Sequence, residues 1–114
     1  MLSKRGEWWL GTKCPYNFEV YDSELENRYM FRLEADSHVE AWTKRHGMMI
    51  PWYNGQKQLR RYIPDFLVRY ADGSIAVVEV KDPSRVDSPE VQRKRKAAEL
   101  WCRQRGMTYE IATL

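Results

Sequence analysis

Residues 75–81 read Ile-Ala-Val-Val-Glu-Val-Lys and form the most apolar strand pattern of the sequence. Apolar residues at both odd and even positions predict a strand that is buried on both faces, as in the centre of an α/β sheet. Glu79 and Lys81 should project from the same face, about 7 Å apart. Burying such charges costs several kcal/mol per ion unless a partner or a metal compensates. For these two residues alone, an ion pair at a strand end is a sufficient explanation.

A third charged residue falls in the neighbouring strand, which the pattern predicts over residues 59–70. Asp65 follows Pro64 there, and a proline within a strand forfeits a ladder hydrogen bond. Two acids and a lysine on one sheet face suit phosphodiester hydrolysis. Asp65 and Glu79 would hold a hard divalent cation, which prefers oxygen ligands. Lys81 would orient the attacking water or neutralise charge that develops on the phosphate.

The turn between these two strands decides whether the acids can meet. A two-residue turn at Asp72-Gly73 would place Asp65 across from Val80 and point it away from Glu79. A three-residue loop over 71–73 would place Asp65 directly opposite Glu79. The glycine of that loop suits its left-handed position, and the aspartate suits the position before it. The sequence therefore predicts the three-residue loop.

The remaining pattern predicts one helix before the strands and another after them. Ser23, with Glu26 three residues later, fits a capping box at the start of the first helix. Pro89 suits the first position of the second helix, and Gly106 suits its end. The expected elements are a helix over 22–35, a meander of strands over 48–53, 59–70 and 75–81 with a hairpin signal at 54–55, a loop over 82–87, a helix over 88–105 and a strand over 107–112. This order, α-β-β-β-α-β, indicates an α/β fold with a mixed central sheet flanked by helices.

Length and composition favour one compact domain over residues 22–114, preceded by an aromatic arm over residues 1–21. Trp8, Trp9 and Phe18 make the arm too apolar for a simple linker, so we expect it to pack on the domain or to contact a partner. No apolar run is long enough to span a membrane, and no signal peptide opens the chain. These features indicate the cytoplasm, or the nucleoid within it.

The cysteines and histidines do not predict a zinc site. Cys14 and Cys102 lie far apart without ligand spacing, so two reduced thiols are expected. His38 and His46 form no recognisable ligand set either, and both are expected on the surface or in loops.

Basic residues are clustered more strongly than the net charge of +3 suggests. Residues 93–105 contain six lysines and arginines and a single acid, and Arg60 and Arg61 form a second basic spot. Such clusters suit phosphate binding, although a solvated helix face explains the first cluster equally well. The candidate phosphate-binding residues are Arg93, Lys96, Arg60 and Arg61, together with Gln92, which lies one helical turn before Lys96.

Pro64-Asp65 followed by Glu79-Val80-Lys81 matches the PD-(D/E)XK nuclease signature. Together with the segments 22–26 and 61–67, the pattern resembles the TnsA-type transposon endonuclease and related small phage nucleases. The resemblance implies a restriction-endonuclease-like core and Mg²⁺-dependent DNA cleavage, for which Mn²⁺ would substitute. It also implies that the Val80 carbonyl is a further metal ligand and that an acid on the first helix, matched by Glu26, belongs to the site.

Two alternatives remain open from the sequence. Glu26 would serve only the helix cap if its carboxylate faced Ser23, but its neighbours at helical spacing, Met30 and Leu33, are apolar and favour an inward position beside the other acids. The whole domain could also be a non-catalytic DNA-binding or partner-docking module on the same fold. The expected partner is DNA, with a homodimer or a larger DNA-processing complex as a possible assembly. The sequence shows no second, partner-binding domain, which favours a phage or mobile-element nuclease that acts alone.

Overall fold

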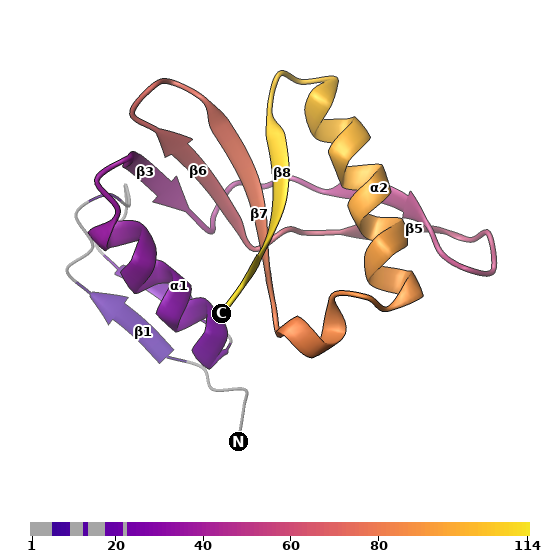
Figure 1. Cartoon of the computed structure of the whole chain (residues 1–114), viewed down its shortest axis with the longest axis horizontal. Coiled ribbons are helices and arrows are strands. Elements are labelled where there is room, and N and C mark those ends of the chain that lie inside the picture. Colours follow the sequence, from indigo (N-terminus) through magenta and orange to yellow (C-terminus); the bar gives the residue numbers. More distant parts are fainter. Residues whose placement is uncertain (1–5, 10–12, 14–17, 22) are drawn as a thin grey trace.

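The computed structural model describes residues 6–9, 13, 18–21 and 23–114, and side chains are described for residue 13 and residues 23–114 (Figure 1). Two α-helices, one short 3-10 helix and eight strands are formed by these residues. The elements are β1 Gly6–Trp9, β2 Phe18–Tyr21, α1 Glu24–Ala35, β3 Val39–Thr43, β4 Ile50–Tyr53, β5 Leu59–Tyr62, β6 Phe66–Tyr70, β7 Ile75–Lys81, η1 Pro83–Arg85, α2 Pro89–Arg103 and β8 Thr108–Thr113.

A four-stranded mixed sheet with the order β3-β6-β7-β8 forms the centre of the domain. The pairs β3–β6 and β6–β7 are antiparallel, whereas β8 lies parallel to β7 after the crossover through α2. In Figure 1 this sheet lies between α1 and α2. The predicted α/β class with a mixed sheet and flanking helices is confirmed, and the architecture is compatible with a restriction-endonuclease-like core.

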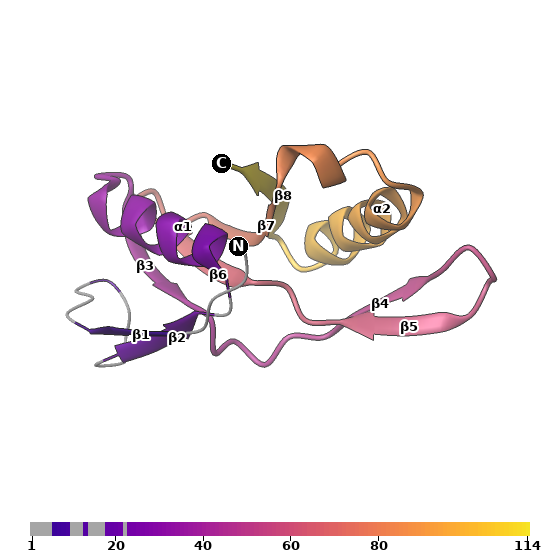
Figure 2. The same cartoon turned by 90° about the horizontal axis from the view of Figure 1, so that it is seen from below.

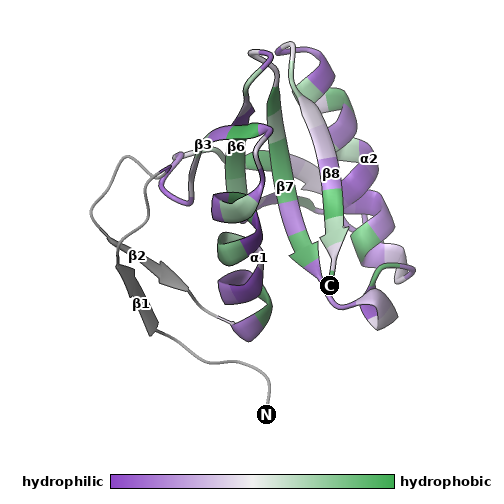
Figure 3. Cartoon of the chain, turned by 60° about the vertical axis from the view of Figure 1, so that its left-hand side comes forward, coloured by the Kyte–Doolittle hydropathy of each residue, from purple (hydrophilic) through white to green (hydrophobic). Residues whose placement is uncertain are grey.

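Strand β7 is buried on both faces, as its apolar pattern predicts. Val78 and Val80 pack in one core cluster with Phe66 and the apolar side of α1, whereas Val77 packs in a second cluster with Ala98 of α2. Successive residues of a strand point to opposite faces, so each helix covers one face of the sheet. Figure 3 shows β6 and β7 as largely hydrophobic strands, in contrast to the hydrophilic outer side of α2.

The predicted three-stranded meander is wrong in two respects. The segment 59–70 is not one strand, because it breaks at residues 63–65 around Pro64, and its first part, β5, pairs with β4 in a separate two-stranded hairpin. The structure also contains β3, which the sequence pattern did not predict and which takes the edge position beside β6. A proline cannot donate to a ladder, so the chain leaves one sheet before Pro64 and enters the other after it.

The predicted three-residue loop between β6 and β7 is confirmed. Tyr70 N–H donates to the Ser74 carbonyl at 2.9 Å, and Gly73 N–H donates to the Tyr70 carbonyl at 2.9 Å, which closes a turn over residues 71–73. Gly73 has a φ of 89°, in the left-handed region that the loop requires. This register is the one that brings Asp65 opposite Glu79.

Both helices begin and end close to the predicted residues. The Ser23 hydroxyl accepts a hydrogen bond from Glu26 N–H at 3.1 Å and caps α1. The Ser88 hydroxyl caps α2 through Val91 N–H at 3.2 Å, with Pro89 in the first turn. Gly106, with a φ of 73°, follows α2 as expected. The last strand begins and ends one residue later than predicted.

The backbone of the N-terminal arm forms the two-stranded sheet β1–β2, which lies beside α1 (Figure 2). The predicted packing of Trp8, Trp9 and Phe18 lies outside the described side chains, as does Cys14. Cys102 is a free thiol buried in the second core cluster, and burial raises its pKa to about 11. In the part of the chain that the structure describes, no helix has the length and apolarity needed to cross a membrane.

Candidate active site

The predicted acids meet where β6 begins and β7 ends. The last recorded ladder pair is Phe66 with Val78, and one further step in this register places Asp65 opposite Glu79. The Asp65 side chain confirms that this residue lies against the end of β7, because its Oδ2 accepts a hydrogen bond from Val80 N–H at 2.8 Å. Asp65 lies in the bend just before β6 and not in the middle of a strand, which corrects its predicted position.

Pro64 explains why a backbone oxygen is available beside these acids. Hydrogen-bonded pairs alternate along an antiparallel ladder, and the bond from Tyr70 N–H to the Ser74 carbonyl fixes which pairs they are. Continued in steps of two beyond the last recorded pair, Phe66 with Val78, the same register would put Pro64 in a hydrogen-bonded position opposite Val80. A proline has no N–H, so it cannot donate to the Val80 carbonyl. Pro64 would therefore leave that carbonyl without a donor from β6, which makes its oxygen a candidate ligand at the edge of the site.

His46 holds the bend that presents Asp65. Met48 N–H donates to His46 Nδ1 at 3.0 Å, so the neutral ring carries its proton on Nε2, which donates to the Pro64 carbonyl at 2.7 Å. Burial lowers the pKa of His46, which favours this neutral form. The sequence pattern predicted only a surface or loop histidine here. A sequence reveals functional histidines mainly through metal-ligand spacing. A histidine that donates to a backbone carbonyl leaves no such spacing, so the sequence could not predict this contact.

Glu79 and Lys81 project from β7 to the same side, as predicted. Lys81 Nζ lies 3.6 Å from Glu79 Oε2, and the Glu79 side chain is only 14% exposed. Burial raises the pKa of Glu79, and the positive charges of Lys81 and of Lys94 on α2 oppose this rise. Within the described part of the chain, the buried Glu79 Oε1 has no hydrogen-bond partner. A buried carboxylate oxygen without a donor is a position that a cation would satisfy.

Asp65 is the most perturbed acid of the site. Its pKa is raised to about 7. Burial is the largest cause, the nearby charges of Glu79 and Glu26 add to the rise, and the hydrogen bond from Val80 N–H and the charge of Lys44 oppose it. Burial is thus a larger cause of the raised pKa than the repulsion between Asp65 and Glu79.

Glu26 reaches the site from the first turn of α1. Its carboxylate contacts Lys44 Nζ, and both side chains are largely buried. Its charge is close enough to raise the pKa of Asp65. Ser23 and Glu26 do form a cap, since the Ser23 hydroxyl binds Glu26 N–H, but that contact uses the Glu26 backbone. The carboxylate itself is placed toward the other acids, as the sequence favoured.

The residues predicted to bind DNA are less closely grouped. Gln92 Nε2 donates to the Val86 carbonyl at 2.7 Å and so fastens the loop before α2. Lys96 lines a surface depression with Glu99, Arg103 and Tyr109. Lys94 lies two residues before Lys96 and therefore on a different side of α2. Of these two lysines, Lys94 is the one whose charge opposes the rise in the pKa of Glu79. The sequence pattern passed over Lys94 because charge clustering does not show which side of a helix faces the site.

The donor atoms fit a divalent cation, although only sparsely. No group of three or more Asp, Glu, His or Cys side chains able to hold a metal ion occurs among the described residues. The available set is the two carboxylates of Asp65 and Glu79 with the Val80 carbonyl. All three are hard oxygen donors of the kind that Mg²⁺ takes, and Mg²⁺ usually keeps several waters beside one or two carboxylates.

A known family model covers most of the chain. The family model described as TnsA-like endonuclease N terminal matches residues 21–114, which include every residue of the candidate site. The chain belongs to this family. No curated protein matches the chain significantly. The predicted resemblance to TnsA-type endonucleases is therefore confirmed, and membership of the TnsA-like family supports a nuclease-related function.

The raised pKa of Asp65 predicts how the stability of this TnsA-like domain depends on pH. With a folded pKa of about 7 against an ordinary value of 3.8, the folded state binds more protons than the unfolded state between these values. Stability without metal should therefore fall as pH rises from about 4 to about 7. Asp65→Asn keeps an acceptor for Val80 N–H and removes the charge, so it should be about 1 kcal/mol more stable than wild type at pH 8.

Thermal melts in a metal chelator at pH 5 and pH 8 measure this difference. Asp72→Asn is the matched control, because Asp72 lies at the exposed end of the same hairpin and its hydrogen bonds with Ser74 lower its pKa. The control should not gain stability at pH 8. An Asp65→Asn protein that melts below wild type at pH 8 would contradict the assigned pKa shift.

Proposed function

We propose that this TnsA-like domain is a metal-dependent DNA endonuclease whose active residues are Asp65, Glu79 and Lys81, with Glu26 in support. The observation that carries the proposal is that Asp65 and Glu79 lie together beside Val80. Pro64 has no N–H with which to donate a hydrogen bond to the Val80 carbonyl. Burying two acids together is costly, and a structural role would not require it. Perturbed acids of this kind are typical of functional sites.

Asp65, Glu79 and the Val80 carbonyl would hold the Mg²⁺ ion, and Mn²⁺ would substitute. The ion would polarise the scissile phosphate and lower the pKa of a bound water. Lys81 Nζ, positioned 3.6 Å from Glu79, would orient the attacking water and neutralise charge on the phosphate oxygens. The Glu26–Lys44 pair would keep Asp65 in place and adjust its charge.

Hydrolysis would form a bond from the water oxygen to phosphorus and break the bond from phosphorus to the 3′ oxygen. The leaving 3′ oxygen would take a proton, so the products would be a 5′-phosphate and a 3′-hydroxyl. A nicked plasmid tests the chemistry, because a DNA ligase reseals such ends directly. We expect ligase to restore the closed plasmid after cleavage in Mg²⁺. Nicks that ligase cannot seal without prior kinase treatment would contradict the proposed products.

His46 should act as a positioning residue for Asp65. His46→Ala removes the donor to the Pro64 carbonyl, which could then compete with Asp65 for Val80 N–H. We expect a loss of about tenfold or more in cleavage rate at limiting Mg²⁺, with a weaker apparent affinity for the ion, as for other residues that orient ligands. His46→Gln can still donate to that carbonyl and should recover part of the loss.

His38→Ala is the matched control for the His46 variants. His38 is exposed and pairs with Asp36, away from the site. The rates and the Mg²⁺ dependence of this variant should equal those of wild type. If His46→Ala shows an unchanged Mg²⁺ dependence, the bond to Pro64 has no role in positioning Asp65.

The cellular setting follows from the same proposal. A DNA substrate would place the domain in the cytoplasm or nucleoid, and we propose an origin in a phage or mobile element. Association into a homodimer or a larger DNA-processing complex would allow both strands of a duplex to be cut.

A further inference from the structure

The β4–β5 hairpin carries positive charges and no acid. Residues 41–64, which contain the hairpin and lead into Asp65, include five lysines and arginines and no acid. Figures 1 and 2 show that the hairpin crosses α2 and extends beyond it. A basic ribbon that continues directly into the candidate active site is placed to meet an extended polyanion.

The two faces of this ribbon differ in chemistry. The pairs Ile50–Tyr62 and Trp52–Arg60 share the face that α2 covers, so Arg60 lies on the α2 side. Arg61 pairs with Pro51 and lies on the opposite face. That opposite face also carries large apolar side chains that are more than half exposed, namely Met49, Tyr53, Leu59 and Ile63. The alternation of a strand therefore separates two arginines that the sequence presents as one basic spot.

Cations of α2 connect the α2 side of the hairpin with the acids. Lys94 Nζ lies 5.1 Å from the ring centre of Trp52 and 5.4 Å from that of Tyr62, while its charge also acts on Glu79. Lys94 also forms an ion pair with Glu90 at 3.6 Å, and it does so while its ammonium group lies near both rings. Lys94 therefore lies between the candidate active site and the hairpin.

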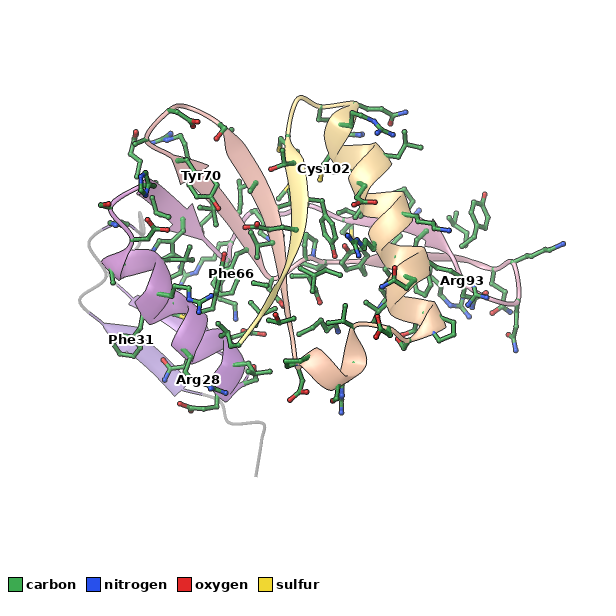
Figure 4. All side chains as sticks on the ribbon, in the orientation of Figure 1. Arg28, Phe31, Phe66, Tyr70, Arg93 and Cys102 are labelled. Carbon is green, nitrogen blue, oxygen red and sulfur yellow. The ribbon has the colours of Figure 1, made fainter. Side chains whose placement is uncertain are left out.

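Arg93 extends this row to the hairpin tip. A Cβ atom placed on Gly55 would lie 3.0 Å from Arg93 Nη1, so the guanidinium rests against the tip, as the labelled side chain in Figure 4 shows. Lys81, Lys94 and Arg93 thus follow one another from β7 to the tip. This order could not be read from the sequence, where Arg93 and Lys94 are only two members of a long basic run.

Hydrogen bonds from side chains order the tip of the hairpin. The Asn54 side chain accepts hydrogen bonds from Gln56 N–H at 2.9 Å and from Gln58 N–H at 3.0 Å. Arg60 Nη2 donates to Gln58 Oε1 at 2.8 Å, which directs the guanidinium along the ribbon. A preformed tip lowers the ordering cost of binding.

We propose that Lys94, Arg93 and Arg60 form a phosphate-binding track that carries the DNA backbone from the active site along the exposed edge where α2 meets the β4–β5 hairpin. The proposal rests on the proposed function for its choice of DNA as the polyanion. Phosphate contacts of this kind fix the orientation of a nucleic acid without reading its sequence. The apolar opposite face, with Arg61, takes no part in the track.

The matched pair Arg60→Gln and Arg61→Gln tests the track, because both arginines are exposed neighbours on one strand and differ in the face they occupy. Binding of a labelled DNA duplex to the intact protein is followed by fluorescence anisotropy in a metal chelator, over a series of salt concentrations. We expect Arg60→Gln and Arg93→Gln each to weaken binding severalfold. Each should reduce the slope of log affinity against log salt by about 0.9, the value for one phosphate contact.

Arg61→Gln should change affinity by less than about twofold, since exposed charges away from a contact have small effects. If Arg61→Gln weakens binding as much as Arg60→Gln, or if neither variant has an effect, the track is overturned. The nuclease proposal is judged separately by plasmid cleavage in Mg²⁺. A protein that cleaves without a difference between the two arginines loses only the track, whereas one that binds with the expected difference and never cleaves loses only the nuclease proposal.

Discussion

Asp65→Asn, Glu79→Gln and Lys81→Ala should each lower the rate of plasmid cleavage by more than about 10³-fold, because each removes several kcal/mol of transition-state stabilisation. The first two changes remove a carboxylate from the proposed ligand set. The third removes the ammonium group that lies 3.6 Å from Glu79. The measurement is the rate of conversion of supercoiled plasmid to nicked circles in Mg²⁺, with circular dichroism to show that each variant is folded.

Asp72→Asn and Glu40→Gln are the controls for these losses. Asp72 lies in the exposed turn at the far end of the β6–β7 hairpin, and Glu40 pairs with Arg69 on the surface. Both variants lose one negative charge and should cleave as wild type does. A folded Asp65→Asn or Glu79→Gln protein that retains the wild-type rate would remove its residue from the active site.

Glu26→Gln should lower the cleavage rate by about 10²-fold, whereas Glu24→Gln should change it by less than about twofold. Both acids lie in the first turn of α1, so they share the same helix and the same cap. Glu24 accepts a hydrogen bond from Asn27, whereas Glu26 contacts Lys44 beside Asp65. Neutralising Glu26 leaves the Lys44 charge less compensated next to the proposed ligands and weakens their attraction for a cation.

The pH dependence of the rate separates an electrostatic role of Glu26 from a purely structural one. Since the Glu26 charge helps to raise the pKa of Asp65, Glu26→Gln should move the acidic limb of the pH–rate profile to lower pH. Equal rates and equal profiles for the Glu24 and Glu26 variants would return Glu26 to a capping role alone.

The turn before β7 shows how far sequence reasoning can reach. Asp72-Gly73 ordinarily favours a two-residue hairpin, but only a three-residue loop brings Asp65 opposite Glu79. The requirement that the acids share a face selected the loop that the structure contains. The register could be predicted here because side chains alternate strictly along a strand. A shift of one residue would have placed Asp65 and Glu79 on opposite faces of the sheet.

The parts that could not be predicted depend on contacts between distant segments. Strand β3 has a short pattern with mixed burial, and it is a strand because β6 offers it an open edge. The break at Pro64 reads as a flaw in one long strand until the separate partners of β5 and β6 are known. The role of His46 and the position of Lys94 likewise follow from packing across the fold and leave no local pattern.

The most direct test of the account is cleavage of supercoiled plasmid by wild type and by Asp65→Asn, each incubated with Mg²⁺ and with a chelator. The account predicts nicking by wild type in Mg²⁺, no nicking when the ion is chelated, and none by Asp65→Asn in either condition. Wild-type protein that leaves the plasmid intact in both Mg²⁺ and Mn²⁺, or that nicks it equally well in the chelator, would contradict the account.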